Sequence, residues 1–504
     1  MIDGSFVFYF IFYIVLCMVL NDNNKDEAIE IFRKVLAMGV DFKLRENVHE
    51  KNISGDAILR ILSKLPDRGE PMNAILGEFE ESILPYCTNF SSKKFVGFPD
   101  AGNSVGALAG GILSEFLQQN LINQSFCAPS GTFVEIAVLQ WLREAVGYDN
   151  GDVKDVWDVG GIITPGGTVS NSMGMLLARE NKEPGTLEKG VTDPNLFKVI
   201  VPKGIGHYSV KSAQMWIGCG HNLLEVETND FRYDLSELKK TLIENKGRVM
   251  ALVAYVGDSR TMTVDNLDAI ADLVHSVDPK IWLHADACHG FSLGFSNSLK
   301  YKIKGIEKFD SVSTDPHKVL LTPYTISAFL VKDPQNMKKI TSLSDLIMQE
   351  QFAFGQITPF LGSKAWSSLK LWFMMKNFGK EGLDELITKR HALAVYLSKL
   401  LEQDEDFEVL NEVEINSVAF FYTGGKKLAV SELNALNKGI HARLAQEGLY
   451  HIHQFSIPDR GLFEKGAIVY PMRFMSGNPN LAEIDIRELV EYIRVLGKDI
   501  EAIA

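Results

Sequence analysis

The chain has 504 residues, of which 46% are hydrophobic and 23% are charged. This ordinary globular composition excludes disordered and fibrous proteins, and the length allows two or three domains around a large buried core. The net charge is −13, and because no basic run is present, it argues against nucleic acid or an anionic membrane as the main partner. Five widely spaced cysteines without a CxxC pair indicate a reducing compartment and no structural zinc site, so we expect a cytoplasmic protein without a bound metal.

The first feature along the chain is an unbroken apolar run at residues 6–20, FVFYFIFYIVLCMVL. It is shorter than the roughly 17 to 25 residues of a membrane-spanning helix. It also has neither a basic region before it nor a small-residue cleavage site after it. Three interpretations stay open: a short membrane anchor, a buried or interface segment, and upstream sequence translated from an early start codon ahead of Met18. We favour the last two and do not expect membrane association.

The middle of the chain alternates short apolar runs with helical patterns. Helical spacing is already present at residues 24–38, and Ser130 precedes a second helix-like segment. The apolar runs are 159–164, 198–202, 223–227, 248–256, 281–285, 311–314 and 326–331, and helical patterns between them include 210–217, 235–245 and 267–277. This alternation predicts an α/β fold with a mainly parallel sheet.

In the C-terminal part the alternation of apolar runs and helical patterns ends. Residues 368–401 predict a long helix with a break near Gly379, and the shorter segments after it predict a small α+β domain. We therefore expect an N-terminal helical segment at 1–94, a large domain at 95–378, and a connecting helix with a small domain at 379–504.

A glycine-rich turn at residues 164–171, TPGGTVSN, separates an apolar run from a helical pattern. Its glycines let backbone N–H groups approach an anion, the hydroxyls of Thr168 and Ser170 add donors, and the helix N-terminus is partially positive. By itself the segment is better explained as a tight turn with a helix cap. It is neither GxGxxG nor a Walker sequence, so it does not indicate a dinucleotide or a nucleoside triphosphate.

Three further residues follow predicted strands. His207 lies between a strand and a helix, where a histidine is more often structural. Asp286 ends a strand that we expect to be buried on both faces, and a buried carboxylate is costly without a cationic partner, although a helix cap is an equal explanation. Lys318 follows Asp286 by 32 residues, so both side chains can reach the same sheet edge, where ligands bind in open parallel sheets. Lys318 is either a solvated turn residue or an amine suited to a Schiff base.

These four elements complement one ligand. An anion cradle, a flat histidine, a carboxylate able to hold a protonated ring nitrogen and an imine-forming lysine match the phosphate, ring face, pyridine nitrogen and aldehyde of pyridoxal 5′-phosphate (PLP). We therefore predict PLP as the cofactor.

From about Phe95 to the C-terminus the chain resembles the group II PLP-dependent amino-acid decarboxylases, which include glutamate, aromatic amino-acid and cysteine-sulfinate decarboxylases. The resemblance rests on SGTFVEIAVLQWL, GGTVSN, HYSVKSA, LHADACHG, DSVSTDPHK, LKLWFMMKNFG and MRFMSGNPN. It implies the aspartate-aminotransferase-like fold, called fold type I, and a homodimer with active sites at the subunit interface.

The resemblance also implies a role for each site residue. Lys318 would be the Schiff-base lysine, Asp286 would pair with the pyridine nitrogen, and His207 would stack on the ring. The remaining cofactor contacts would be Gly167, Thr168 and Asn171 at the phosphate, His317 beside it, and Ala287 under the ring. Arg473 matches a recurrent arginine of the small domain, for which a structural salt bridge is the alternative.

The chain departs from the family at several positions. Cys288 replaces the second alanine after the aspartate, and residues 257–259, GDS, replace a GTT-like turn. Segment 333–362 holds the place of the mobile catalytic loop but contains no tyrosine, whereas in many amine-forming members a loop tyrosine supplies the proton. Its aromatic residues are Phe352, Phe354 and Phe360.

Decarboxylation of an L-amino acid to the amine and carbon dioxide is the function that we expect. Because a phenylalanine in this loop accompanies aldehyde formation in related plant enzymes, aldehyde-forming oxidative deamination is one alternative. A carbon–carbon lyase resembling sphingosine-phosphate lyase is another, favoured by the apolar N-terminus and the HxDAC element but disfavoured by DPHK and LKLW. A scaffold without cofactor is disfavoured by Lys318 and Asp286. We expect a neutral or aromatic substrate first and an acidic one second.

Overall fold

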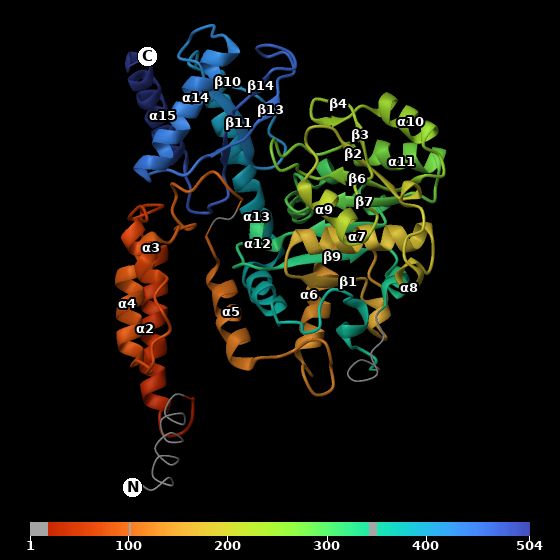
Figure 1. Cartoon of the computed structure of the whole chain (residues 1–504), viewed down its shortest axis with the longest axis horizontal. Coiled ribbons are helices and arrows are strands. Elements are labelled where there is room, and N and C mark those ends of the chain that lie inside the picture. The colour runs from red at the N-terminus through yellow and green to blue at the C-terminus, as the bar shows by residue number, and fades with distance from the viewer. Residues whose placement is uncertain (1–18, 100–101, 342–349, 504) are drawn as a thin grey trace. The chain divides into compact units, whose positions relative to one another are not determined.

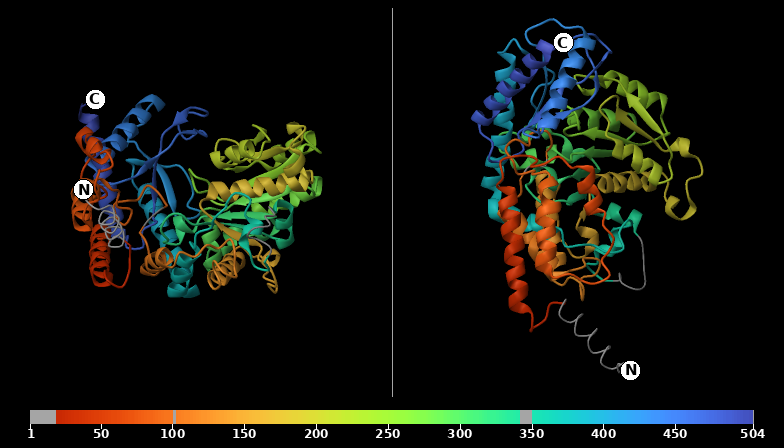
Figure 2. Two further views of the ribbon diagram at one scale, coloured as in Figure 1. Left: turned by 60° about the horizontal axis from the view of Figure 1, so that its bottom comes forward. Right: turned by 60° about the vertical axis from the view of Figure 1, so that its left-hand side comes forward.

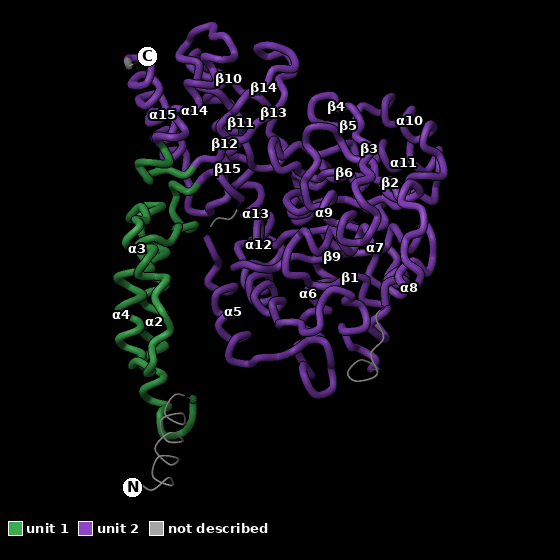
Figure 3. Tube along the Cα trace, in the orientation of Figure 1, with its two compact units in different colours: residues 1–95, 444–451 green, residues 96–443, 452–504 purple. Residues whose placement is uncertain are grey.

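The computed structural model describes residues 19–99, 102–341 and 350–503. The chain forms two compact units, of which the first contains the residues up to Phe95 together with Leu444–His451. The second contains Val96–Arg443 and Ile452–Ala504 (Figure 3). The boundary that the sequence predicts inside the second unit, at residues 378 and 379, stays a prediction.

The first unit is helical. Its elements are α2 Lys25–Lys43, α3 Gly55–Ile61, α4 Met72–Ser82 and the short 3₁₀ helix η1 Leu84–Tyr86. The helix predicted at 24–38 is confirmed and extends to Lys43. No residue of α2 or α4 is buried within the structure. Of the apolar run at residues 6–20, all but Val19 and Leu20 lie outside the described residues, and no described helix meets the length and apolarity that crossing a membrane requires.

A seven-stranded sheet forms the centre of the second unit (Figure 1). Its strands are β1 Gly161–Thr164, β2 Lys198–Pro202, β3 Leu223–Val226, β6 Val249–Tyr255, β7 Trp282–Asp286, β8 Ser311–Thr314 and β9 Ser327–Val331. They lie in the order β1-β9-β8-β7-β6-β2-β3, parallel except for the two pairings of β9. Every predicted strand of this sheet is confirmed, with ends that move by at most two residues.

Helices connect and cover these strands. The α-helices of this part are α5 Val105–Leu117, α6 Gly131–Ala145, α7 Gly167–Lys182, α8 Thr186–Lys189, α9 Tyr208–Trp216, α10 Leu235–Glu244, α11 Leu267–Val277 and α12 Pro316–Val319. The 3₁₀ helices are η2 Val156–Asp158, η3 Pro194–Leu196, η4 Gly290–Phe295, η5 Lys300–Ile303, η6 Ile306–Lys308, η7 Pro334–Ile340 and η8 Phe354–Ile357. In α7, every residue from Ser170 to Glu180 is buried, so this helix lies inside the unit rather than on its surface.

The last part of the second unit contains a smaller antiparallel sheet. The long helix α13 Ser368–Glu402 leads to it, and Gly379 with φ 63° interrupts that helix, so the predicted break is confirmed. The remaining elements of this part are β10 Phe407–Val409, β11 Ser417–Tyr422, β12 His453–Gln454, β13 Ile457–Pro458, β14 Ile468–Val469, β15 Met472–Met475, α14 Val430–Glu447 and α15 Glu483–Ile503. Earlier in the chain, between β3 and α10, β4 Thr228–Asn229 and β5 Arg232–Tyr233 form a separate hairpin. Figure 2 shows α14, α15 and the small sheet in blue, grouped beside the green and yellow elements of the large sheet.

The direction of the strands locates the functional edge. Because β1 and β8 both run antiparallel to β9, β1 points the same way as the parallel strands. The carboxyl ends of β1, β2, β7 and β8 therefore lie at one edge, and the loops after them contain the predicted site residues.

Candidate active site

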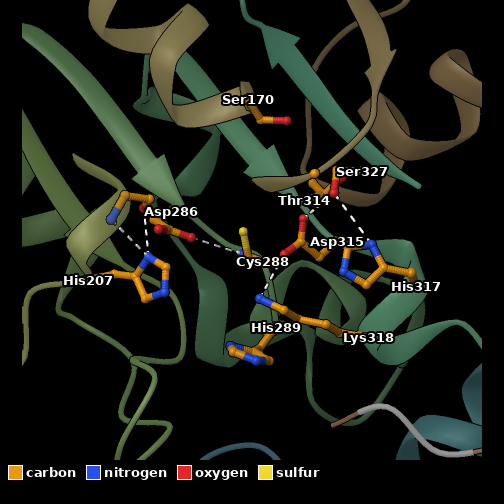
Figure 4. Close-up of polar contacts among 12 residues, drawn as sticks. Ser170, His207, Asp286, Cys288, His289, Thr314, Asp315, His317, Lys318 and Ser327 are labelled. Carbon is orange, nitrogen blue, oxygen red and sulfur yellow. Dashed lines mark hydrogen bonds and ion pairs between the residues drawn. The ribbon is translucent and has the colours of Figure 1, made fainter. Parts of the chain in front are cut away.

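Lys318 lies just after the carboxyl end of β8. Pro316 begins the short helix α12, and the backbone N–H of Lys318 donates to Asp315 O at 2.9 Å. The Nζ of Lys318 lies 2.7 Å from Asp315 Oδ2, and the side chains are 23% and 3% exposed (Figure 4). Burial lowers the pKa of Lys318, but Asp315 and the neighbouring anionic groups together outweigh burial and raise it. Burial opposes ionisation of Asp315 as well, yet the charge of Lys318 lowers its pKa to about 2. The structure therefore holds an ammonium group beside a carboxylate here.

Asp286 is the last residue of β7 and is 6% exposed. Its Oδ2 accepts a hydrogen bond from Asn171 Nδ2 at 2.9 Å, and its Oδ1 accepts from the N–H of Cys288 at 3.4 Å. Among the described residues no lysine or arginine forms an ion pair with it. A buried carboxylate with neutral donors alone is stabilised by a cationic group of a bound ligand.

His207 is the N-cap of α9. Its Nδ1 accepts the N–H of Ser209 at 3.3 Å and lies 2.7 Å from Ser209 Oγ. Its own N–H donates to the hydroxyl of Tyr255 at 2.8 Å. Burial lowers the pKa of His207, so the ring is neutral at physiological pH.

The glycine-rich turn after β1 leads directly into α7. No side chain caps this helix, and the N–H groups of Gly167 and Thr168 have no acceptor in the described parts of the chain. A Cβ on Gly167 would lie 2.8 Å from both carboxylate oxygens of Asp315 and 2.8 Å from Cys288 Sγ. Only glycine allows this approach, so the free donors of a helix N-terminus lie against the Lys318–Asp315 pair, an arrangement that suits a phosphate.

The other predicted cofactor residues lie nearby. The N–H of the buried Ala287 donates to Ser313 O at 2.9 Å, and His317 Nδ1 lies 2.7 Å from Ile326 O. The amide of Asn171 was expected at the phosphate, but its Nδ2 contacts Asp286 and, at 2.8 Å, Ser209 Oγ, and its Oδ1 lies 2.9 Å from His284 Nε2. The structure thus joins Asn171 to Asp286, and its contact with phosphate stays a prediction.

Arg473 is 3% exposed, and burial lowers its pKa to about 10. Its guanidinium donates to two backbone carbonyls, Ser259 O and, at 3.1 Å, Gly97 O. It forms no ion pair with any carboxylate that the structure describes, so a structural salt bridge does not account for it.

Four site residues had no role assigned from the sequence: Ser209, His284, His289 and Asp315. Two of them carry a signal in the sequence. Asp315 lies between a predicted strand and Lys318, and His284 is a histidine inside a strand predicted to be buried on both faces. The buried His289 has its Nδ1 3.2 Å from Gly257 O, and burial followed by the charge of Lys318 lowers its pKa. Figure 4 shows His289 beside Lys318.

These groups fit PLP. The amine of Lys318 suits its aldehyde, the carboxylate of Asp286 suits a protonated pyridine nitrogen, and the unbonded N–H groups of Gly167 and Thr168 suit its phosphate. The fit uses a buried carboxylate without an ion-pair partner among the described residues, the N–H groups of Gly167 and Thr168 that have no acceptor there, and an amine beside them.

Comparisons with known proteins agree with this chemistry. The model of the pyridoxal-dependent decarboxylase conserved domain matches residues 56–423. Cysteine sulfinic acid decarboxylase of Mus musculus is 29% identical over 457 residues, which cover 87% of this chain and 88% of that protein. Acidic amino acid decarboxylase GADL1 of Bos taurus is 29% identical over 461 residues, covering 86% and 83%.

Solved structures agree as well. The apo form of mouse cysteine sulfinic acid decarboxylase, CSAD, superposes with a TM-score of 0.83 at 26% identity and covers 94% of this chain and 99% of that one. The tryptamine-bound Oryza sativa enzyme TDC with PLP has a TM-score of 0.85 at 20% identity, covering 96% and 100%, and shows the likeness of fold. The chain therefore belongs to the pyridoxal-dependent decarboxylase family, as a fold type I enzyme that uses PLP to decarboxylate an amino acid.

Proposed function

We propose that this enzyme removes the carboxylate of an L-amino acid as carbon dioxide and releases the amine, with Lys318 carrying the cofactor as a Schiff base. The observation that carries the proposal is the Lys318 amine, 2.7 Å from Asp315, at the same sheet edge as the buried Asp286. When bound, PLP supplies an electron sink for the electron pair that remains as carbon dioxide leaves.

The chain's own residues have distinct tasks in this proposal. Asp315 keeps the Lys318 side chain in place when it is not bonded to the cofactor, since the ion pair orients its Nζ. Asp286 holds a proton on the pyridine nitrogen through its charge, and the neutral ring of His207 covers one face of the cofactor. The first N–H groups of α7 bind the phosphate. Lys318 would also return a proton to the substrate's Cα.

The product is the amine in this proposal, with the aldehyde as its alternative. Of the three loop phenylalanines, Phe354 is fully buried, and Phe352 packs edge-to-face on Phe133 with centroids 5.2 Å apart. Phe360 is 40% exposed. Two of the three thus serve the packing of the large domain, which weakens the argument for aldehyde formation.

An amino acid with an acidic side chain is our first candidate substrate, ahead of the aromatic one that the sequence favoured. Two relatives at 29% identity are named for cysteine sulfinic acid and for acidic amino acids. The guanidinium of Arg473, which has no ion-pair partner among the described residues, adds a positive charge near Ser259 and His289. A negative side chain of the substrate suits this region.

A homodimer is also part of the proposal. In the second unit, α5 exposes Val105, Leu113, Phe116 and Leu117. In the first unit, α2 exposes Phe32, Val35 and Leu36. Several exposed apolar side chains on one helix favour a protein interface there. The four described cysteines are free, which is in keeping with the predicted cytoplasmic location.

The test uses purified enzyme with PLP and a panel of L-amino acids, including cysteine sulfinate, aspartate, glutamate and the aromatic ones. We expect an absorbance band near roughly 420 nm from the lysine imine, carbon dioxide release from an acidic member, and stoichiometric amine without peroxide. Aldehyde with peroxide would replace the amine proposal with its alternative. A chain that binds PLP but releases no carbon dioxide from any member of the panel would refute the proposed function.

A further inference from the structure

A buried chain of hydrogen bonds lies beneath the site, and the proton positions along it can be derived. It begins at Trp282 in β7, whose indole N–H can only donate and lies 2.8 Å from Ser311 Oγ. Ser311 is fully buried, so its own hydroxyl hydrogen needs an acceptor, and the available one is His284 Nδ1 at 2.8 Å. The Nδ1 of His284 therefore accepts.

The tautomer of His284 follows from this. Burial lowers the pKa of His284 to about 4, so its ring is neutral and carries its single proton on Nε2. That Nε2 lies 2.9 Å from Asn171 Oδ1 and 3.2 Å from Ser313 Oγ. His284 therefore donates to the carbonyl oxygen of the Asn171 amide, which fixes which end of the amide faces it.

The other end of the amide gives an independent check. Asn171 Nδ2 lies 2.9 Å from Asp286 Oδ2, and a carboxylate can only accept. The same Nδ2 lies 2.8 Å from Ser209 Oγ. Both neighbours thus require the same amide orientation, with the oxygen toward His284 and the nitrogen toward Asp286.

The hydrogen bonds of Ser209 determine which nitrogen of His207 carries the proton. Because its oxygen accepts from Asn171, its hydroxyl hydrogen is directed to His207 Nδ1 at 2.7 Å, and its backbone N–H reaches the same Nδ1 at 3.3 Å. With two donors at Nδ1, the neutral ring of His207 carries its proton on Nε2.

A glycine in α7 makes this series of hydrogen bonds possible. Gly174 lies one turn after Asn171 on the same helix face. A Cβ on Gly174 would lie 2.7 Å from Cε1 and from Nδ1 of His284. The glycine lets the helix approach the histidine closely enough for Asn171 to reach it.

We propose that Asn171 is a positioning residue that ties Asp286 to His207, and that His284 locks its amide so that His207 presents an Nε2–H donor to the site. The proposal rests on the proposed function, in which Asp286 and His207 contact the cofactor. One amide then sets the positions of two cofactor contacts, one at the end of β7 and one at the start of α9.

The direct test is the tautomer of His207 in the wild-type holoenzyme. The protein is labelled with ¹⁵N-histidine and measured by solid-state NMR, and the signals of His207 are assigned by their loss in His207→Gln. We expect a neutral ring with the proton on Nε2. A proton on Nδ1, or an imidazolium at neutral pH, would overturn the proposal.

Paired variants test the positioning role through the dissociation constant of PLP from the apoenzyme. Asn171→Leu removes the amide at similar size, and His284→Leu removes the lock. Each is expected to weaken PLP binding about 10- to 100-fold, because Asn171→Leu removes a buried hydrogen bond to the charged Asp286 and His284→Leu removes the donor that orients the Asn171 amide toward it. His284→Gln can accept from Ser311 and donate to Asn171, so it is expected to bind within about threefold of wild type. The control is Asn181→Leu, near the end of α7, which should bind PLP as wild type does.

Wild-type PLP affinity in Asn171→Leu, or equal weakening in His284→Gln and His284→Leu, would show packing instead of positioning and would refute the role. If the leucine variants do not fold, the tautomer measurement still decides, because it needs no change in the buried chain. None of these readouts requires a substrate. An enzyme that binds PLP and shows the expected tautomer but releases no carbon dioxide would refute the proposed function and leave this inference standing.

Discussion

Asp315→Asn removes the charge that faces the Lys318 amine while keeping the size of the side chain and an oxygen for the hydroxyl of Ser327. The expected loss of stability follows from the ion pair between Asp315 and Lys318. The pKa of Asp315 lies at about 2, compared with a usual value of 3.8, and this difference corresponds to about 2 kcal/mol of stabilisation of the charged form. Because Asp315 is 3% exposed, solvent screens the pair weakly, and the loss can reach about 3 to 5 kcal/mol when a buried charge is left alone.

Two quantities are measured on the apoenzyme. The free energy of unfolding in urea at neutral pH is expected to fall by about 2 to 5 kcal/mol. The second is the rate at which the band near roughly 420 nm appears after PLP is added, recorded as a function of pH. Without the carboxylate the pKa of Lys318 falls, so more of the reactive neutral amine is present at neutral pH, and the midpoint should move down by at least about one pH unit.

The lowered pKa of Asp315 also sets how the stability of the wild type depends on pH. The contribution of Asp315 to stability is fully present above about pH 3.8 and is lost as the pH falls from there through about 2. The matched control is Asp268→Asn, which breaks two surface ion pairs, with Lys304 and with Lys308, and should lower the free energy of unfolding much less because solvent screens both pairs. The role assigned to Asp315 would be contradicted if Asp315→Asn left the pH midpoint unchanged and lost no more stability than Asp268→Asn.

Three further predictions concern single positions. Lys318→Ala should leave a folded protein that shows no imine band and no carbon dioxide release, and full turnover in it would end the assignment of the Schiff-base lysine. Gly167→Ala should lower stability by about 1 to 3 kcal/mol and weaken PLP binding, because its Cβ would lie 2.8 Å from Asp315 and Cys288. The control is Gly166→Ala, which has no atom within 4 Å of its Cβ. Equal losses of stability in the two variants would count against the close approach at Gly167. The pKa of His284 is lowered from 6.5 to about 4, so the unfolded chain binds more protons between these values, and stability should fall by about 3 kcal/mol as the pH drops through this range. His284→Gln should flatten that part of the pH profile, and an unaltered profile would show that His284 is not buried as a neutral ring.

Much of the large sheet could be predicted because parallel strands covered on both faces are continuous apolar runs. Residues 198–202 and 311–314 were assigned as strands with the bounds that the structure shows. The interruption of α13 at Gly379 was also predictable, because glycine adopts its φ of 63° without strain. Such features depend on residues close together in the chain.

The partners of the polar site residues could not be predicted in the same way. No cation close to Asp286 in sequence was found, and its hydrogen-bond donor turned out to be Asn171, 115 positions away. Arg473 was open to a salt bridge, yet it donates to carbonyls at Ser259 and Gly97. These contacts join segments that only the packing of α7 and the small sheet brings together.

The sequence by itself determined the α/β architecture and the cofactor, and it predicted Lys318 as the Schiff-base lysine, because apolar periodicity and the residue types after each strand carry that information locally. Only the tertiary structure decided how the site is held. The pairing of Lys318 with Asp315, and the orientation of one amide between His284, Asp286 and Ser209, depend on distances between distant segments. Hydrogen bonds require a donor and an acceptor within about 3 Å, and that condition is met only once the helices and strands have packed.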